Sequence, residues 1–169
     1  MPISERGLML LRFLEGVRSH AYKDARGWLT IGCGHLLTRD ELMSGKLRIG
    51  DRVVHWLEGL EPAQSEVLLR NDLAGVERAV ARMHLLDQAQ VDALCSFTFN
   101  VGIDAFQDST LAQCLALQDY AAVPAQLRRW VYSGGKVIKG LQHRREAEVA
   151  MWEGHWTLPR RRRLLRVEG

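Results

Sequence analysis

Residues 15–35 read EGVRSHAYKDARGWLTIGCGH, and the fold of the chain depends on this stretch. It contains two carboxylates, Glu15 and Asp24, and a hydroxyl group at Thr30. Strand-forming residues flank Asp24 on both sides, and Gly27 can adopt the positive φ that a tight turn requires. The stretch therefore predicts a β-hairpin that carries a carboxylate at its turn.

Glu15 closes a segment in which apolar residues recur at helical spacing, and Gly16 is a residue that often ends a helix. The negative end of the helix dipole and partial burial are both expected to favour the protonated carboxyl group. A carboxyl group that is protonated near neutral pH is what a general acid requires. With Asp24 on a separate element, the pair suits hydrolysis of a glycosidic bond. Spacing alone leaves open the alternative that Glu15, Asp24 and Thr30 are ordinary helix-end, turn and strand residues.

The spacing of these residues resembles a known signature. Glu, eight residues, Asp, five residues, Thr and then I-G-x-G-H are arranged as in the catalytic region of the bacteriophage lysozymes (endolysins, muramidases of glycoside hydrolase family 24). Residues 92–102, 105–111 and 129–145 resemble later blocks of that family, in the same order. The resemblance extends over about residues 5–156 and is carried by several separate blocks.

The resemblance implies a fold class and its division. We expect a mostly helical α+β, lysozyme-like fold with two lobes: a small β-hairpin lobe over about residues 16–60 and a larger helical lobe over about residues 84–156, which also includes the first helix. A long linker helix over about residues 62–80 should join the lobes, with the cleft between them. Residues 1–156 would form the catalytic domain, and residues 157–169 a basic C-terminal tail.

The same resemblance implies the chemistry. The substrate would be bacterial peptidoglycan, cleaved without a cofactor at the β-1,4 bond between N-acetylmuramic acid and N-acetylglucosamine. Glu15 would act as general acid, and Asp24 and Thr30 would act on the attacking water. The implied inversion needs roughly 6.5–9.5 Å between the carboxyl groups. His35 and Asp72 are expected to pair near the site. Two alternatives stay open: a lytic transglycosylase acting on the same bond, and a non-catalytic wall-binding module.

Composition argues against several other classes. The chain has 169 residues and a formal net charge of +3. Residues 157–169 hold five arginines and one glutamate, a charge of +4, so the rest of the chain is close to neutral and does not indicate a nucleic-acid-binding protein. Three cysteines at spacings unlike a metal site argue against a disulfide framework. His143 and Glu146 lie three residues apart, but two candidate ligands do not make a metal site.

No secretory signal is recognisable, and the early apolar run at residues 8–11 is far too short to cross a bilayer. We therefore expect synthesis in the bacterial host cytoplasm and release across the inner membrane by a separate pore-forming protein. The protein should act on the cell wall as a monomer. The arginines of the tail are expected to contact anionic groups of the bacterial envelope.

Local patterns predict the remaining elements. Ser4, Thr38, Asp87 and Ser109 are candidate helix caps, and Pro62 suits the first turn of the linker helix. Residues 51–60 are expected to form an insertion or an irregular connection. An edge strand is expected over residues 46–50, and helices over residues 4–15, 38–45, 62–80, 87–102, 109–117, 119–132 and 141–152.

Overall fold

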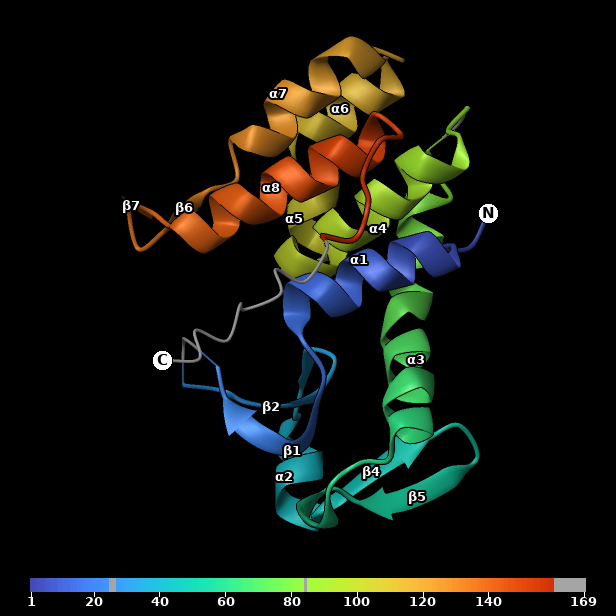
Figure 1. Ribbon diagram of the computed structural model, residues 1–169, viewed down its shortest axis with the longest axis vertical. Helices are drawn as coiled ribbons and strands as arrows, with labels where there is room; N and C mark the ends of the chain where they lie inside the picture. Colours follow the sequence, from blue (N-terminus) through green and yellow to red (C-terminus); the bar gives the residue numbers. More distant parts are fainter. Residues whose placement is uncertain (25–26, 84, 160–169) are drawn as a thin grey trace, which may run out of the picture.

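The computed structural model describes residues 1–24, 27–83 and 85–159 of the chain (Figure 1). Its elements fall into two lobes joined by one long helix, α3 (Pro62–Val80). The small lobe comprises β1 (Arg18–Lys23), β2 (Leu29–Gly32), β3 (His35–Leu36), α2 (Arg39–Ser44), β4 (Lys46–Ile49), β5 (Arg52–His55) and the 3₁₀ helix η1 (Trp56–Glu58). The helical lobe comprises α1 (Glu5–Glu15), α4 (Gln88–Val101), α5 (Ile103–Gln107), α6 (Thr110–Ala116), the 3₁₀ helix η2 (Tyr120–Ala122), α7 (Val123–Arg128), β6 (Tyr132–Ser133), β7 (Lys136–Val137) and α8 (Lys139–Trp152). The chain thus has the mostly helical α+β fold that the sequence predicted.

The small lobe is built on antiparallel strand pairs. β1, β2 and β3 form a three-stranded sheet in sequence order, in which Tyr22 lies opposite Thr30 and Ile31 opposite His35. The register shifts between Arg18 and Tyr22, which is the mark of a β-bulge and re-aims the side chains of β1. The predicted hairpin is therefore present, with longer pairing than the sequence indicated.

Residues 51–60 were predicted to be an insertion or an irregular connection, and the structure shows that they are not irregular. β5 pairs residue by residue with β4, beginning with Ile49 opposite Arg52. Gly50 allows this tight connection because its φ is 59°, a conformation that favours glycine. Trp56 follows β5, is buried, and donates its indole N–H to the backbone oxygen of Glu41 at 2.8 Å. The segment is an ordered hairpin that closes one side of the small lobe.

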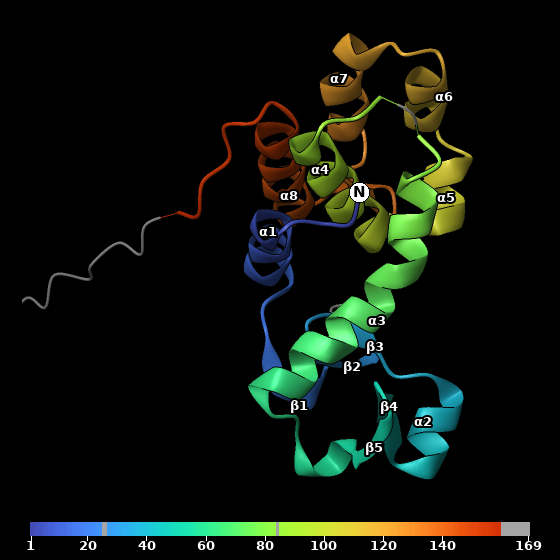
Figure 2. The ribbon, with the colours of Figure 1, turned by 90° about the vertical axis from the view of Figure 1, so that its right-hand side faces the viewer.

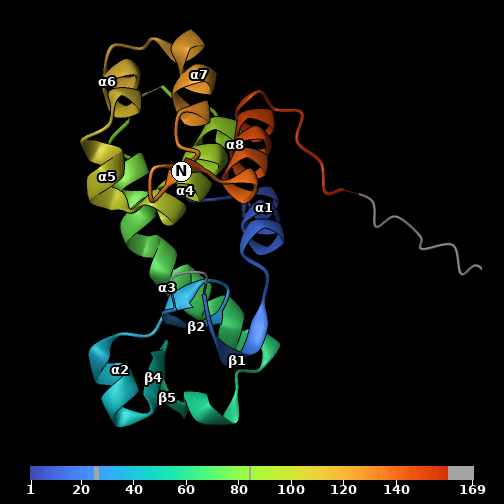
Figure 3. The same cartoon turned by 90° about the vertical axis from the view of Figure 1, so that its left-hand side faces the viewer.

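Two hydrophobic clusters form the interiors of the lobes, and α3 contributes to both. Leu68 of α3 packs in the cluster of the small lobe, which also contains Ile31, Leu37, Leu47, Ile49, Trp56 and Leu60. Leu69, Leu73 and Val76 of α3 pack in the larger cluster of the helical lobe. Figures 2 and 3 show α3 running from the helical lobe to the small sheet. Because it buries side chains in both clusters, α3 ties the lobes together through packing.

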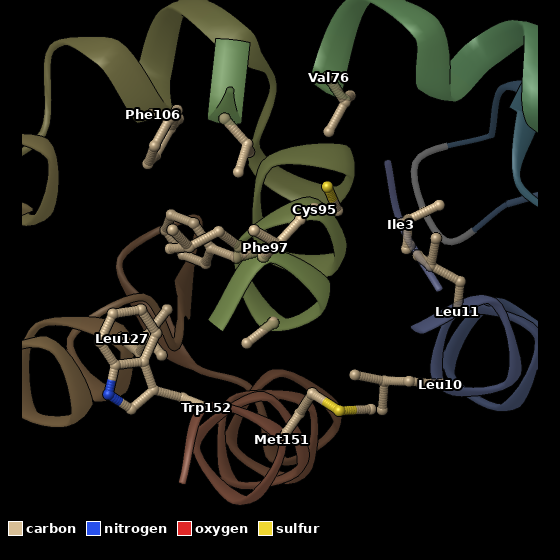
Figure 4. Close-up of a cluster of buried hydrophobic side chains, with 14 of the residues drawn as sticks. Ile3, Leu10, Leu11, Val76, Cys95, Phe97, Phe106, Leu127, Met151 and Trp152 are labelled. Atoms are coloured by element: carbon tan, nitrogen blue, oxygen red, sulfur yellow. The ribbon is translucent and has the colours of Figure 1, made fainter. Parts of the chain in front are cut away.

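The central element of the helical lobe is α4. Its residues Cys95 and Phe97 are fully buried, and α1, α3 and α8 all contact the helix. Figure 4 shows these side chains in the core together with Leu10 of α1 and Met151 of α8. Burying a side chain of this size stabilises the fold by roughly 1.5–3 kcal/mol. This packing fixes the C-terminal end of α4, which faces the small lobe.

Side-chain caps begin the helices where the sequence predicted. Ser4, Thr38 and Asp87 accept hydrogen bonds from backbone N–H groups in the first turns of α1, α2 and α4. Each cap satisfies a donor that the helix itself leaves unpaired. These three starts could be predicted because the cap and its partner lie within one turn of sequence.

The helix predicted over residues 119–132 is shorter in the structure. The 3₁₀ helix η2 leads into α7, and α7 ends at Arg128. The chain then forms the hairpin of β6 and β7, because Gly134 and Gly135 both adopt positive φ and make a two-residue turn. The two glycines were expected to form a loop, and here that loop joins two short strands.

Only the first part of the predicted basic tail is described. Residues 157–159 are exposed, and residues 160–169, which hold the arginine run, lie outside the described residues. Arg6 of α1 secures the preceding segment by donating to the backbone oxygens of Gly154, at 2.9 Å, and of Trp156. Within the described ranges, every helix is too short or too polar to cross a membrane.

Candidate active site

Glu15 is the last residue of α1, at the junction between the lobes. Gly16 ends the helix with a φ of 71° and donates its backbone N–H to Arg12 O at 3.0 Å, so the chain turns out of α1 toward β1. Gly34 lies against the Glu15 carboxyl group, since a Cβ atom added at Gly34 would be 3.2 Å from Glu15 Oε2. The glycine therefore leaves the space that this carboxyl group occupies.

Asp24 and Thr30 are held by the β1–β2 hairpin. The backbone N–H of Trp28 donates to Asp24 Oδ1 at 2.9 Å, and the Trp28 carbonyl accepts from the Asp24 N–H at 2.9 Å. Gly27, with a φ of 85°, donates its N–H to Asp24 O at 2.9 Å and completes the turn. Thr30 is buried on β2, and its hydroxyl donates to the Trp28 carbonyl at 3.4 Å. Both predicted site residues are thus fixed through the backbone of Trp28.

The three predicted site residues line one pocket, which has a volume of about 190 Å³. Its wall combines the end of α1, the small sheet and the end of α4: Glu15, Tyr22, Asp24, Trp28, Thr30, Gly34, Leu36, Phe99 and Asn100. Larger hollows of about 480 and 450 Å³ occur elsewhere, but neither is lined by any of the three residues. The smaller pocket is the candidate active site, because it unites two carboxyl groups and a hydroxyl group from separate elements.

Arg144 is a residue at this site to which the sequence analysis gave no role. It lies on α8, and its Nη1 donates to Glu15 Oε1 at 2.6 Å. Its Nη2 donates to Ser96 O at 3.2 Å, which attaches the guanidinium group to α4. The helix dipole and partial burial were expected to keep Glu15 protonated, whereas the guanidinium group of Arg144 places a positive charge against it. The block over residues 129–145 contained Arg144, but nothing local in the sequence pairs it with a residue so distant.

Two other titratable groups near Glu15 are neutral at physiological pH. Burial, and then the charge of Glu15, raise the pKa of Cys33 to about 12. Burial and Glu15 also raise the pKa of Tyr22. A thiol and a phenol that keep their protons supply no nucleophile at neutral pH. The carboxyl groups and the hydroxyl group therefore remain the candidate reacting groups of the pocket.

His35 and Asp72 form the contact that the sequence predicted. His35 Nδ1 lies 3.0 Å from Asp72 Oδ1 and 2.9 Å from Oδ2, which joins β3 to α3. Glu41 of α2 is a third member, with its Oε2 3.3 Å from His35 Nε2. Burial lowers the pKa of His35, but the hydrogen bonds and charges of Asp72 and Glu41 outweigh burial and leave it raised. These three side chains are called the histidine cluster below.

One of the two residues considered for a metal site, Glu146, is engaged in an ion pair. Glu146, three residues from His143, accepts a hydrogen bond from Arg128 Nε at 2.8 Å in an exposed ion pair. Across residues 1–24, 27–83 and 85–159, no three side chains of His, Cys, Asp or Glu gather where they could hold a metal ion.

The sequence model of one protein family, phage lysozyme, matches residues 12–148, which is most of the chain. The chain belongs to the phage lysozyme family. The matched region includes Glu15, Asp24, Thr30 and Arg144, so the candidate active site lies within it. As a member of this family, the lysozyme is an endolysin-type muramidase, a hydrolase that acts on the cell wall.

Individual relatives agree with this assignment over nearly their full lengths. The endolysin of Acyrthosiphon pisum secondary endosymbiont phage 1 is 37% identical over 162 residues, which covers 90% of this lysozyme and 99% of that protein. The crystal structure of a P22 lysozyme mutant is similar at a TM-score of 0.72 and 35% identity, and covers 90% and 99% of the two chains. The endolysin from Escherichia coli O157:H7 phage FAHEc1 is similar at a TM-score of 0.76 and 28% identity, and covers 94% and 98%. The predicted lysozyme-like fold is confirmed.

Proposed function

We propose that this lysozyme hydrolyses the β-1,4 bond between N-acetylmuramic acid and N-acetylglucosamine, with Glu15 as general acid and Asp24 and Thr30 acting on the attacking water. The observation that carries the proposal is that these three side chains, one from the end of α1 and two from the β1–β2 hairpin, line one pocket between the lobes. Family membership implies peptidoglycan as the substrate and supports this choice of bond.

The contact with Arg144 suits the acid step. Glu15 Oε1 accepts from Arg144 Nη1 at 2.6 Å, so Oε2, beside Gly34, is the oxygen that would carry the transferable proton. Glu15 would give this proton to the glycosidic oxygen as the bond to the anomeric carbon breaks. The carboxylate that forms would then be stabilised by the guanidinium group already in contact with it.

The water step would use the hairpin. Asp24 would accept a proton from the water or stabilise the oxocarbenium-like transition state, while Thr30 would position the water. Inversion requires room for that water, roughly 6.5–9.5 Å between the carboxyl groups, whereas a retaining route through Asp24 requires roughly 5–5.5 Å. NMR spectra of the earliest products decide between the routes, because first appearance of the β-anomer would rule out inversion.

The acid assignment is tested by Glu15→Gln, with Glu5→Gln on the same helix as a matched surface control. An amide cannot donate the required proton, so Glu15→Gln should lower turnover by at least about 10²-fold, while Glu5→Gln should retain it. Thermal unfolding shows whether both variants are folded. Near-normal wall lysis by folded Glu15→Gln protein would overturn the proposal.

Asp24→Asn and Thr30→Val test the water step. Each should lower kcat more than it weakens binding to walls, because both groups are proposed to act on the water. Mass spectrometry of the products addresses the alternatives: reducing ends indicate hydrolysis, 1,6-anhydro ends indicate a lytic transglycosylase, and intact peptidoglycan indicates a wall-binding module. A folded variant with unchanged kcat would remove that residue from the mechanism.

The cellular context stays a prediction from the sequence. We propose that the lysozyme acts as a monomer, is made in the host cytoplasm and crosses the inner membrane with the help of a separate pore-forming protein. Expression with and without such a protein tests the route, since lysis should require both. Contact of the tail with anionic envelope groups is likewise proposed from its charge.

A further inference from the structure

A buried group of charges lies next to the candidate active site. Arg144, Arg145 and Glu148, called the arginine cluster here, are all on α8, and their side chains are at most 7% exposed. Arg144 donates to Glu15 Oε1 at 2.6 Å, to Glu148 Oε1 at 3.0 Å and to Ser96 O at 3.2 Å. Two carboxyl groups, one at the active site and one in the core, therefore share a single guanidinium group.

Glu148 is fully buried and does not line the pocket. It accepts hydrogen bonds from Ser96 Oγ at 2.9 Å and Arg144 Nε at 3.0 Å, and its Oε2 lies 3.2 Å from Arg145 Nη1. Burial raises the pKa of Glu148, while the two arginines and the hydrogen bond from Ser96 act against burial. A neutral Glu148 would leave two buried guanidinium groups short of a counterion, which is a costly arrangement. Glu148 is therefore the ionised partner of both arginines.

The charges balance only while Glu15 is ionised. Arg144 and Arg145 carry two positive charges, and Glu15 and Glu148 carry two negative charges. When Glu15 takes up the proton that a general acid must carry, Glu148 is the carboxylate that remains in contact with Arg144. Its contact with Nε also fixes the plane of the guanidinium group, so that Nη1 faces Glu15.

We infer that Glu148 is a positioning residue for the acid step: it orients Arg144 toward Glu15 and supplies the negative charge that allows Glu15 to be protonated before catalysis. This role rests on the proposed function, because it assumes that Glu15 is the general acid. Without the charge of Glu148, Arg144 would depend on Glu15 as its counterion and would hold Glu15 in the ionised, inactive form. Glu148 does not line the pocket and acts through Arg144.

The surrounding groups would stay unchanged when Glu148 is altered. The other titratable or charged groups near Glu15 come from β1 and its turn, the β2–β3 connection, α1 and α3: Tyr22, Asp24, Cys33, Arg12 and Glu66. On α4, Asn100 accepts from Arg145, and the ring of Phe97 lies 4.9 Å from the guanidinium carbon of Arg145. On α7, Arg128 is already paired with the exposed Glu146. None of these contacts involves the carboxylate of Glu148.

The test is Glu148→Gln, which removes the charge but keeps an oxygen that can accept from Arg144 and Ser96. The matched control is Glu146→Gln, two residues away on the same helix and in an exposed pair. The pH dependence of wall lysis and a carboxyl-carbon NMR titration of Glu15 are measured for both. Glu148→Gln should move the alkaline limb of the rate profile and the titration of Glu15 to lower pH. It should also lower kcat at neutral pH about tenfold, with KM little changed. Glu146→Gln should match the wild type.

Each outcome bears on one proposal. A folded Glu148→Gln protein in which Glu15 titrates as in the wild type would overturn the coupling. If Glu148→Gln does not fold, Ser96→Ala serves as a second variant, because it removes one hydrogen bond from the Glu148 carboxylate. Ser96→Ala should move the alkaline limb of the rate profile to lower pH by a smaller amount. An unchanged alkaline limb in Ser96→Ala would also overturn the coupling. The NMR titration needs no activity, so it still tests the coupling if Glu15→Gln shows that Glu15 is not the acid.

Discussion

Two charged clusters flank the candidate active site, and they differ in their exposure to water. In the arginine cluster, the side chains of Arg144, Arg145 and Glu148 are 7%, 1% and 0% exposed. In the histidine cluster, the side chains of His35, Asp72 and Glu41 are 12%, 24% and 22% exposed. Water can replace a lost partner in the second cluster but not in the first. Similar ion pairs should therefore differ widely in what their loss costs.

The largest effect is expected from breaking the buried cluster. Arg145→Ala removes the guanidinium group 3.2 Å from Glu148 and leaves a cavity beside Phe97. Glu148 would keep Arg144 as its one guanidinium partner, and this weaker pairing together with the cavity should lower the free energy of unfolding by about 3–5 kcal/mol. Urea unfolding measures the loss. Arg128→Ala, which breaks the exposed pair with Glu146, is the control and should cost about 0–1 kcal/mol. Equal losses would show that burial does not separate the two kinds of pair.

A smaller effect is expected in the histidine cluster. Double-mutant cycles with His35→Gln and Asp72→Asn should give a coupling free energy of about 1–2 kcal/mol, because the hydrogen bonds join charged groups that stay partly hydrated. Unfolding in urea at mildly acidic pH supplies the four free energies. A coupling of zero would mean that the contact does not tie β3 to α3 in solution.

The histidine cluster should also be the one that responds to pH. The pKa of His35 is raised above 6.5, so its share of stability is present below that pH and is lost as pH rises through the folded-state value. Burial acts to raise the pKa of Glu41, but hydrogen bonds from Thr38 and contact with His35 leave it below 4.5. Its share is present above pH 4.5 and is lost as pH falls through the folded-state value. The difference in unfolding free energy between wild type and His35→Gln should be greatest between pH 4.5 and 6.5.

Features of the fold that depend on nearby residues could be predicted from the sequence, whereas features that depend on distant partners could not. The caps at Ser4, Thr38 and Asp87 and the turn at Gly27 depend on partners within a few residues, so local patterns were sufficient. The strand β5 was missed because its order comes from pairing with β4 more than from its own composition. The end of α7 at Arg128 was missed for a related reason, since the β6–β7 hairpin decides it.

In the candidate site, too, residues close together in the sequence could be predicted, whereas residues brought in by distant helices could not. Glu15, Asp24 and Thr30 lie within 16 residues of one another, and their spacing matched a family signature. Arg144 is 129 residues from Glu15, and Asn100 enters the pocket from α4, so their positions depend on how the helical lobe packs. Glu148 is fully buried and does not line the pocket, so no exposure identifies it as a residue of the site. A local pattern finds reacting groups more readily than the buried groups that hold them.

The smallest effect is expected from the basic C-terminal tail, residues 157–169. Five arginines and one glutamate give this segment a charge of +4. A lysozyme truncated after Trp156 should retain hydrolysis of small soluble wall fragments, because the pocket residues all precede that point. Its activity on whole envelopes at low salt should fall, since each arginine near an anionic surface contributes about 1 kcal/mol to attraction. Turbidity assays on both substrates measure the two activities.

Salt decides whether this loss comes from charge. The Debye length shortens to about 8 Å at physiological ionic strength and further at higher salt, so the truncated and full-length forms should converge as salt increases. A full-length variant with Arg160, Arg161, Arg162 and Arg163 changed to Gln keeps the length of the tail and should behave like the truncated form. If that variant keeps full activity at low salt while truncation does not, the apolar residues of the tail act instead of its charge. If all three forms are equally active on whole envelopes at low salt, the tail makes no envelope contact that assists lysis, and the proposed role of its charge is wrong.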